Sequence, residues 1–524
     1  MTVAERAARL TRDEIIALLQ KQEALEARNA ELQRQNEWFK RQLFGQKSER
    51  RLLPADPQQL SLAGMLAPPV EPRKTPPPPT ETVTAYQRRL RGEAGAAAPD
   101  ERELRFEPTV PVEEIRVPNP EVAGLTAVEY EIIGEKVTYR LAQRPGAYVI
   151  LKYVRPVIKR KDTATLACPP APPAVLERSL ADVSLLAGLL VEKFRYHLPL
   201  YRQHQRLADA GIRLNRATLT QWVQRTAALL EPIYYALLSS ILQSKVLAMD
   251  ETPIKAGWQS KGKLHTGYFW PVYGDQDEIA FPYAASRAQA VVREALGQFC
   301  GVLLTDGYTV YERYAQTVNG LVHAQCWSHC RRQFVDAAAV EPPLVAQALE
   351  FIGQLYHQEA QARERQLIDD TLLTWRAEQG KPIVDAFFTW LDRTLREQVL
   401  LPTNPFTKAA RYALEREAAL RVFLEYPTVP LDTNHLEREI RAIALGRKNW
   451  LFCWTELGAR YVGIVQSLLA SCRLQGVDPY VYLVDVLQRI DTHPAFDVHL
   501  LTPRLWKQHF AADPLRSDLD RLRQ

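Results

Sequence analysis

Two short apolar runs, each ending at an aspartate, constrain the fold of this 524-residue chain more than any other feature. Residues 246–249 lead into Asp250, and residues 301–305 lead into Asp306. Such runs are typical of strands buried on both faces of a sheet, although a buried helical segment has the same pattern. Open α/β sheets place their chemistry at the carboxyl ends of strands. Two carboxylates there, with a third acid nearby, suit a pair of divalent metal ions and phosphoryl chemistry.

The composition permits several domains and predicts a soluble cytoplasmic protein. Hydrophobic residues make up 46% of the chain, and the net charge of +5 permits nucleic acid binding without requiring it. The N-terminus is charged, and no apolar run is long enough to span a membrane. The six cysteines lack the spacing of a disulfide framework, which fits a reducing compartment: Cys168, Cys300, Cys326, Cys330, Cys453 and Cys472.

The N-terminal part is predicted to be a dimerisation helix followed by a linker. In residues 1–49 large apolar residues recur every seven positions, at Leu18, Leu25, Leu32 and Phe39. This spacing favours a dimeric coiled coil, and the alternative is one amphipathic helix packed on its own protein. Residues 50–102 are rich in proline, which indicates a linker without a core of its own.

A small β unit and a helical region are predicted next. Residues 103–168 contain β-rich, partly alternating runs, and residues 169–240 read as helices. A helix that ends near Gly211 is followed by Asn215, a suitable cap, and by a helix that opens with Arg216. This order is typical of a helix-turn-helix that binds DNA, and an ordinary helix pair is the alternative.

Residues 241–335 have the element order of a ribonuclease H fold. Three strands, a helix, a strand, a helix or turn and a last strand are predicted in that order: 245–249, 266–273, 279–284, 287–296, 301–305 and 321–325. Residues 336–430 then read as helix throughout, which predicts a helical insertion within the catalytic domain. The fold class is therefore multidomain and mainly α, with an α/β core.

A third acid follows the insertion, in residues 431–490, which are predicted to complete the core. In a helix beginning near Asn434, Glu437 lies beside the buried stripe and can face the two aspartates. The alternative is that Asn434 and Glu437 form a capping box. Cations and an aromatic residue follow, as candidates for holding DNA phosphates or as a plain surface loop: Arg438, Arg441, Arg447, Lys448 and Trp450. Residues 491–524 are predicted to be a weakly patterned tail.

Several motifs, in order along the chain, resemble transposases of the insertion sequence 66 family. They are LFGQKSER at 43–50, KFRYHLPLYR at 193–202, DETP at 250–253, TDGY at 305–308, CWSH at 326–329, NxxER at 434–438, GRKNWLF at 446–452 and PYxYL at 479–483. The resemblance implies a DDE transposase with a ribonuclease H-like core and Asp250, Asp306 and Glu437 as its acidic triad. The family's Cys-x-x-His element corresponds to Cys326 and His329, for which we predict a structural role near the site.

The resemblance implies a metal-dependent reaction on double-stranded DNA. Two Mg²⁺ or Mn²⁺ ions would serve cleavage at the element ends, exposing a 3′-OH that is then joined to target DNA. A homodimer or higher oligomer, a nucleoid location in a bacterium and accessory proteins from the same element are further expectations. The family's cysteine zinc module is missing, because residues 103–166 contain no cysteine, so no zinc is predicted. The alternatives are a structure-specific nuclease and an inactive DNA-binding regulator.

Overall fold

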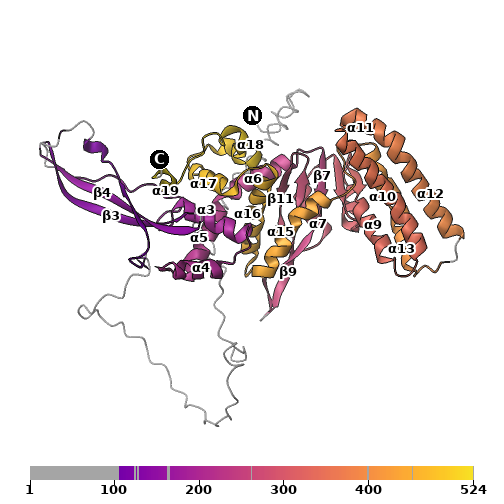
Figure 1. Cartoon of the computed structure of the whole chain (residues 1–524), viewed down its shortest axis with the longest axis horizontal. Helices are drawn as coiled ribbons and strands as arrows, with labels where there is room; N and C mark the ends of the chain where they lie inside the picture. Colours follow the sequence, from indigo (N-terminus) through magenta and orange to yellow (C-terminus); the bar gives the residue numbers. More distant parts are fainter. Residues whose placement is uncertain are drawn as a thin grey trace, which may run out of the picture.

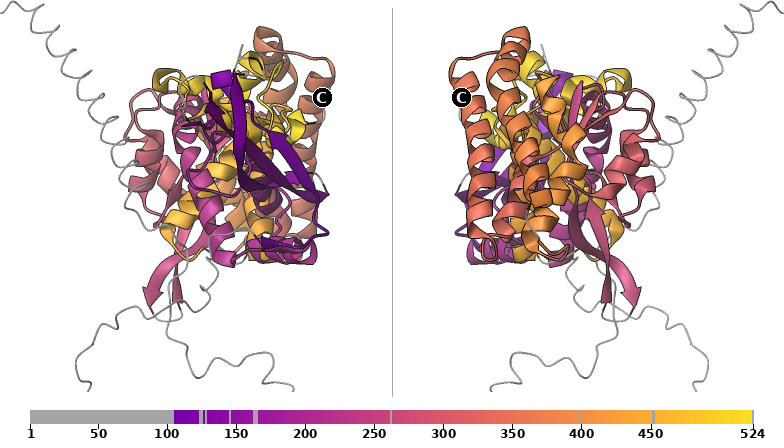
Figure 2. Two further views of the ribbon diagram at one scale, coloured as in Figure 1. Left: turned by 90° about the vertical axis from the view of Figure 1, so that its left-hand side faces the viewer. Right: turned by 90° about the vertical axis from the view of Figure 1, so that its right-hand side faces the viewer.

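The computed structural model describes residues 105–522, apart from 123–125, 127–128, 145, 162–165, 261–262, 398–399 and 451–452. The predicted coiled coil and proline-rich linker lie outside the described residues. The described part is a mixed α/β structure, with a β unit at one end, a central sheet with its helices, and a helical bundle at the other end (Figure 1). Figure 2 shows these two ends face on, with a hairpin arm extending from the body in both views.

The central sheet has five strands in the order β11-β10-β7-β13-β14. Their bounds are β7 Val246–Met249, β10 Val272–Gly274, β11 Glu278–Ala280, β13 Val302–Thr305 and β14 Val322–Gln325. Strands β7, β13 and β14 are parallel, and β10 is antiparallel to both β7 and β11. Both aspartate-bearing runs are therefore neighbouring, buried strands in the middle of one sheet, as the sequence predicts.

Prolines divide two of the expected strands. Pro271 separates β9 (Lys263–Phe269) from β10, and Pro282 separates β11 from β12 (Tyr283–Ala284). A proline has no N–H for a central ladder, so a strand breaks or bends where it occurs. The second expected strand, 266–273, and the third, 279–284, each contribute to two sheets. Strands β8 (Thr252–Ser260), β9 and β12 form the three-stranded arm.

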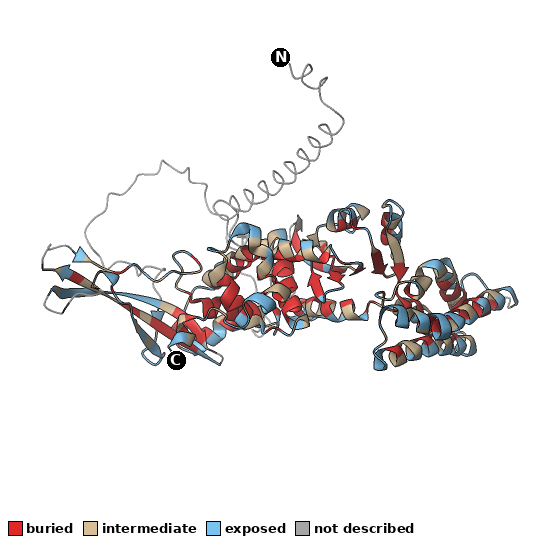
Figure 3. Ribbon diagram, turned by 90° about the horizontal axis from the view of Figure 1, so that it is seen from above, coloured by how far each residue is buried: buried red, intermediate tan, exposed pale blue. Residues whose placement is uncertain are grey.

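Each face of the central sheet is covered by different helices. In β13, Leu303 packs into the main core, whereas Val302 and Leu304 pack into a second core with the helical bundle. This alternation follows from the two-residue period of a strand. Figure 3 shows buried residues concentrated in these central layers.

The edge strand β11 is closed by helix α16 (Glu456–Leu474). The Ser467 hydroxyl accepts the N–H of Phe281 at 2.8 Å, and the Ser471 hydroxyl accepts the N–H of Ile279 at 3.1 Å. A Cβ at Gly463 would lie 2.3 Å from the Phe281 carbonyl oxygen, so this close approach requires glycine. The hydroxyls satisfy backbone groups that would otherwise form an open sheet edge.

The bundle consists of helices between β14 and the third acid. Helix α9 (Trp327–Asp336) leads into it, and its elements are α10 (Pro342–Glu364), α11 (Asp369–Trp375), the π-helical η3 (Arg376–Gly380), α12 (Lys381–Glu397), α13 (Pro405–Glu415), α14 (Glu417–Arg421) and η4 (Val422–Leu424). Helix α15 (Asn434–Trp450) follows. Aromatic rings of Trp327, Phe334 and Phe387 meet in the bundle's core.

The β unit and helical region precede the sheet. The unit contains β2 (Val112–Arg116), β3 (Tyr130–Arg144), β4 (Ala147–Arg160) and β5 (Leu166–Ala167). The helices are α3 (Val183–Phe194), α4 (Leu200–Asp209), α5 (Arg216–Leu229) and α6 (Glu231–Ile241). In the turn between α4 and α5, β6 (Ile212–Arg213) pairs with β1 (Arg105–Phe106). No helix in the described ranges is long and apolar enough to cross a membrane.

The C-terminal segment differs from the weakly patterned tail expected at 491–524. After α17 (Pro479–Arg489) come η5 (Ala495–Leu501), α18 (Pro503–His509) and α19 (Asp518–Arg521). Trp506 and Leu519 are almost fully buried, and Tyr153 of β4 donates to Asp518 at 2.7 Å. Each short helix buries only one or two large side chains, so no period appears in the sequence.

Candidate active site

Asp250 and Asp306 follow adjacent parallel strands at the same level. In the β7–β13 register, Leu247 pairs with Leu303 and Ala248 with Leu304. Two residues further along both strands, the aspartates fall opposite each other. Neighbouring strands lie about 4.8 Å apart, so the two carboxyl groups share one sheet edge. Asp250 Oδ1 accepts the N–H of Glu251 at 2.7 Å, and Asp306 Oδ1 accepts that of Tyr308 at 2.9 Å.

The two aspartates influence each other electrostatically. Burial, together with the smaller effect of the negative charge on Asp306, raises the pKa of Asp250 to about 7. A hydrogen bond from the Glu251 N–H and the nearby His329 ring act in the opposite direction. A carboxylate held in this way gains from any cation that binds beside it.

The start of helix α15, which carries Glu437, is held against the start of helix α9. Trp327 N donates to Leu431 O at 2.9 Å, so the chain leaves the bundle beside the point where it entered. The Cys326 sulfur then accepts both the N–H and the hydroxyl of Thr433, at 3.3 and 3.4 Å. These bonds fix the first turn of α15, which carries Glu437.

His329 connects the third acid to the first. Its Nε2 lies 3.7 Å from Glu437 Oε1, and its ring acts electrostatically on Asp250. Cys326 therefore holds the start of α15, and His329 lies beside the acid that this helix carries. The capping-box alternative for Glu437 has no support, because Asn434 N and Nδ2 both donate to Asp432.

A fourth acid, Glu251, directly follows Asp250 and was not predicted as a site residue from the sequence. Its side chain is only 4% exposed, accepts the Tyr311 hydroxyl at 2.8 Å and forms an ion pair with Arg287. Burial raises the pKa of Glu251. The Arg287 guanidinium lies over the Tyr308 ring, 4.1 Å from its centroid. Adjacency to Asp250 was the one available signal, because Arg287 and Tyr311 are remote in sequence.

The carboxylates have the oxygen donors that Mg²⁺ and Mn²⁺ prefer. The negative charges of Asp250 and Asp306, which oppose each other, would also be stabilised by a cation bound at this edge of the sheet. In the described part of the chain, no group of three or more His, Cys, Asp and Glu side chains is arranged so that it could hold a metal ion. Metal binding by all three acids would therefore require a rearrangement of their side chains.

The predicted DNA-contact residues fall into two groups. Arg216, Arg438, Arg441 and Lys448 are exposed. Arg447 instead donates to the Pro253 carbonyl, and Trp450 packs against the main core.

A plain surface loop was the alternative for the segment after Glu437. This alternative is wrong as far as Trp450, because helix α15 continues to that residue. A Cβ at Gly446 would lie 2.7 Å from the Trp450 ring, which shows how closely the ring covers this turn. Trp450 is therefore a packing residue and is not free to stack on a base.

The helix-turn-helix resemblance is limited to one end of α5. Asn215 caps the helix as predicted, accepting the Ala217 N–H at 3.0 Å, and Arg216 is exposed. Beyond its first turn α5 is largely buried among α3, α4 and α16. Only this N-terminal end is free to approach DNA.

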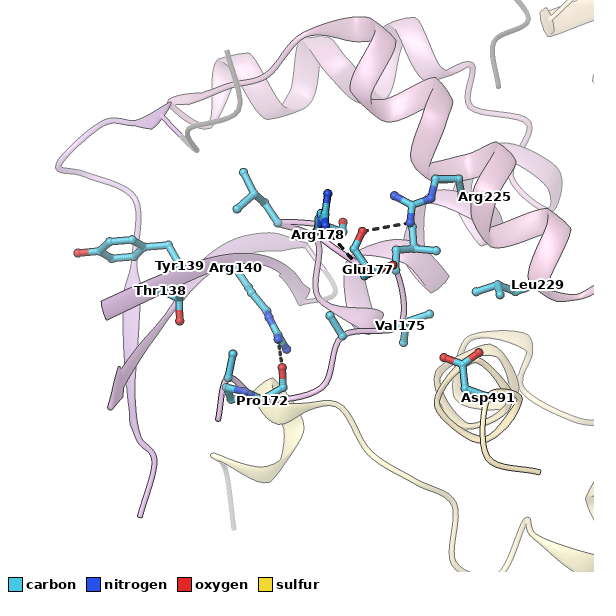
Figure 4. Close-up of a pocket in the computed structure, with 15 residues that line it drawn as sticks. Thr138, Tyr139, Arg140, Pro172, Val175, Glu177, Arg178, Arg225, Leu229 and Asp491 are labelled. Carbon is cyan, nitrogen blue, oxygen red and sulfur yellow. Dashed lines mark hydrogen bonds and ion pairs between the residues drawn. The ribbon is translucent and has the colours of Figure 1, made fainter. Parts of the chain in front are cut away.

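A cavity with a volume of about 730 Å³ lies elsewhere, between the β unit and α5 (Figure 4). Arg140 donates to Pro173 O and Arg225 to Glu177 O, at 3.0 and 3.1 Å. Backbone carbonyls thus engage its arginines, and none of the three predicted catalytic acids lines it.

Known proteins match the chain along most of its length. The model of the Transposase IS66 family matches residues 178–461, which include both aspartates and Glu437. The chain belongs to the IS66 family of transposases. The IS66 C-terminal element matches residues 467–503, and the model described as Transposase C of IS166 homeodomain matches residues 31–115.

Curated relatives of this family member come from Sinorhizobium fredii. Protein y4hP is 30% identical over 404 residues, which cover 72% of each chain. Protein y4jD is 29% identical over 380 residues, covering 68% of this chain and 72% of that protein. Both are described as uncharacterized, so the relatives support the family and add no activity.

Proposed function

We propose that the chain is a DDE transposase whose central sheet is a ribonuclease H-like core. The observation that carries the proposal is the pairing of Asp250 and Asp306 at the ends of adjacent parallel strands. The strand order, with β10 antiparallel between β11 and β7 and with β13 and β14 parallel beyond, agrees with this core. Family membership supplies the reaction class.

The proposed catalytic residues are Asp250, Asp306 and Glu437, which together would hold two Mg²⁺ or Mn²⁺ ions. Such ions supply charge stabilisation for the attacking and leaving oxygens of a phosphodiester. The protein's own contribution is to keep Asp250 and Asp306 together on a rigid sheet edge. Helix α15, whose start is held by the bonds between Cys326 and Thr433, would present Glu437 to that edge.

The proposed reaction has two phosphoryl transfers and no protein–DNA bond. Water attacks a phosphodiester at an element end, the P–O3′ bond breaks, and a free 3′-OH and a 5′-phosphate result. That 3′-OH then attacks a target phosphodiester and displaces its 3′ oxygen. Exposed Arg216, Arg438, Arg441 and Lys448 are proposed to hold DNA phosphates. The N-terminal segment is proposed to join two copies, each with one DNA end.

A labelled-end assay tests this function. The full chain is incubated with Mg²⁺ and DNA carrying the inverted repeats that flank its gene, and cleaved and joined strands are separated. Asp250→Asn, Asp306→Asn or Glu437→Gln is expected to abolish both products while DNA binding survives. Asp336→Asn, at an exposed position of α9, is the control. Cleavage without joining would indicate a nuclease, and undiminished cleavage by a triad variant would remove that residue from the triad.

A further inference from the structure

A second site is suggested by a small cavity bounded by arginines from three parts of the chain. It has a volume of about 160 Å³, far more than the roughly 10–15 Å³ that one water molecule needs. Arg195 follows α3, Arg438 and Arg441 come from α15, and Arg473 comes from α16. These helices lie together in the middle of the molecule (Figure 1). No aspartate or glutamate lines the cavity.

Most of this positive charge is not neutralised within the described residues. Arg473 forms an ion pair with the buried Glu439. For Arg195, Arg438 and Arg441 the described part of the chain provides no ion pair or hydrogen-bond acceptor. Burial lowers the pKa of Arg473, and repulsion by the positive charges on Arg195 and Arg438 lowers it further. Like charges brought together without a counterion cost free energy.

The arginines that line the cavity are open to solvent, and so to a DNA strand. Arg195, Arg438 and Arg441 are exposed, while Phe194 and Leu469 form a buried apolar part of the lining. Guanidinium groups also bind phosphate oxygens in pairs, which a lysine ammonium cannot do.

We propose that this cavity binds one phosphate of the DNA backbone, shared among Arg195, Arg438, Arg441 and Arg473. The proposal rests on the proposed function and adds a defined contact to it. Arg441 lies four residues beyond Glu437, about 6 Å further along α15. A phosphate held here fixes the strand a few nucleotides from the bond to be cut. Arg195 connects the KFRYHLPLYR motif at 193–202 to that strand.

The salt dependence of binding tests whether the arginines share a single phosphate. A fluorescent 30-base-pair duplex is titrated with the full chain in metal-free buffer at several salt concentrations, using Arg195→Gln, Arg441→Gln and the double variant. Each lost phosphate contact lowers the slope of log K against log salt by about 0.9. We expect each single variant to lose up to about that amount and the double variant to lose no more.

Matched controls separate the outcomes. Arg393→Gln removes the same charge from an exposed position of the distant α12 and is expected to leave the slope unchanged. Arg441→Lys keeps a point charge and is expected to retain most of the slope. Unchanged slopes in both glutamine variants would overturn the proposal, as would losses that add to about 1.8 in the double variant. A wild-type chain that binds no duplex would refute the proposed function as well.

Thermal midpoints test whether these arginines have only a structural role. Each glutamine variant removes a repulsive charge, so its midpoint is expected to equal or exceed that of the wild type. Inorganic pyrophosphate, compared with chloride at equal ionic strength, is expected to raise the midpoint of the wild type more than that of the double variant. A lower midpoint in the variants without added anion would assign the arginines to folding and overturn the proposal.

Discussion

Asp250 is a residue whose charge opposes folding in the absence of a cation. Its pKa is about 7 in the folded chain, against an ordinary value of 3.8, because it is buried and faces Asp306. The folded state therefore binds more protons than the unfolded state between about pH 4 and pH 7. Stability contributed by the protonated form is present below that window and is lost as the pH rises through about 7.

The first prediction concerns Asp250→Asn, which keeps the oxygen that accepts the Glu251 N–H and removes the charge. In metal-free buffer the variant is expected to be more stable than the wild type at pH 8 by roughly 1–3 kcal/mol, and to match it near pH 4. Thermal midpoints across this pH range provide the measurement. Mg²⁺ should reduce the difference at pH 8 by binding the wild type. A constant difference at every pH would contradict the proposed cause.

The same residues show what the sequence could and could not predict at this scale. Asp250 and Asp306 were recognisable because each ends an apolar run, and strand periodicity is a local property. Glu437 had a local alternative as a helix cap, and the contacts that decide its position, from Cys326 and His329, are more than 100 residues away in sequence. The ion pair of Glu251 with Arg287 likewise joins residues without a shared local pattern.

At the scale of elements, the start of α15 depends on the start of α9 through one sulfur atom. The second prediction is that Cys326→Ala leaves the Thr433 N–H and hydroxyl without their acceptor. Helix α15 should then be less well fixed, and cleavage is expected to fall roughly 10–100-fold, as for other groups that orient metal ligands. Duplex binding should change little.

Cys330→Ala is the matched control for this prediction. It removes a fully buried thiol one turn further along the same helix, without a bond to α15. Its loss should cost stability while cleavage is kept. Cys326→Ser, which retains an acceptor, should recover much of the activity. Equal effects of the two alanine substitutions on cleavage would show that packing of α9, and not the Thr433 contact, sets the position of Glu437.

The positions of helices and strands along the chain were predicted more accurately than the sheets that the strands join. Strands β7 and β13 and the helices α4 and α5 lie where the sequence predicts them. Pro271 and Pro282 were visible in the sequence, but only the fold shows that each divides one run between the central sheet and the arm. Helices α18 and α19 were not predicted, because their few buried side chains produce no period.

At the scale of the whole molecule, the third prediction concerns the N-terminal heptad segment. Removal of residues 1–49 is expected to lower the oligomeric state, because the leucine repeat is proposed to join two copies. Light scattering coupled to gel filtration provides the measurement. The thermal midpoint of the remaining chain should be unchanged, and joining of two DNA ends should be lost. An unchanged molar mass per assembly would remove the coiled coil as the dimerisation element.

The last prediction concerns the helical insertion, whose ends lie side by side where Trp327 N meets Leu431 O. Residue 337 lies beyond α9, about 15 Å from Trp327 along the helix, so a linker of at least about five extended residues in place of residues 338–430 would lead the chain back to Leu431. The bundle nevertheless covers Val246, Val302 and Leu304 on one face of the central sheet. Its removal would expose that face, at a cost of about 1.5–3 kcal/mol for each large apolar side chain.

We therefore expect the shortened chain to aggregate or to unfold. Recovery in the soluble fraction and the presence of a cooperative thermal transition would measure this. Replacing only residues 366–375 with a short linker is the control, since α11 has no buried residues and Arg376 then keeps its ion pair with Glu359 and its hydrogen bond to Phe423 O. A soluble and cooperatively folding chain without residues 338–430 would show that the insertion is an independent appendage and not part of the catalytic core.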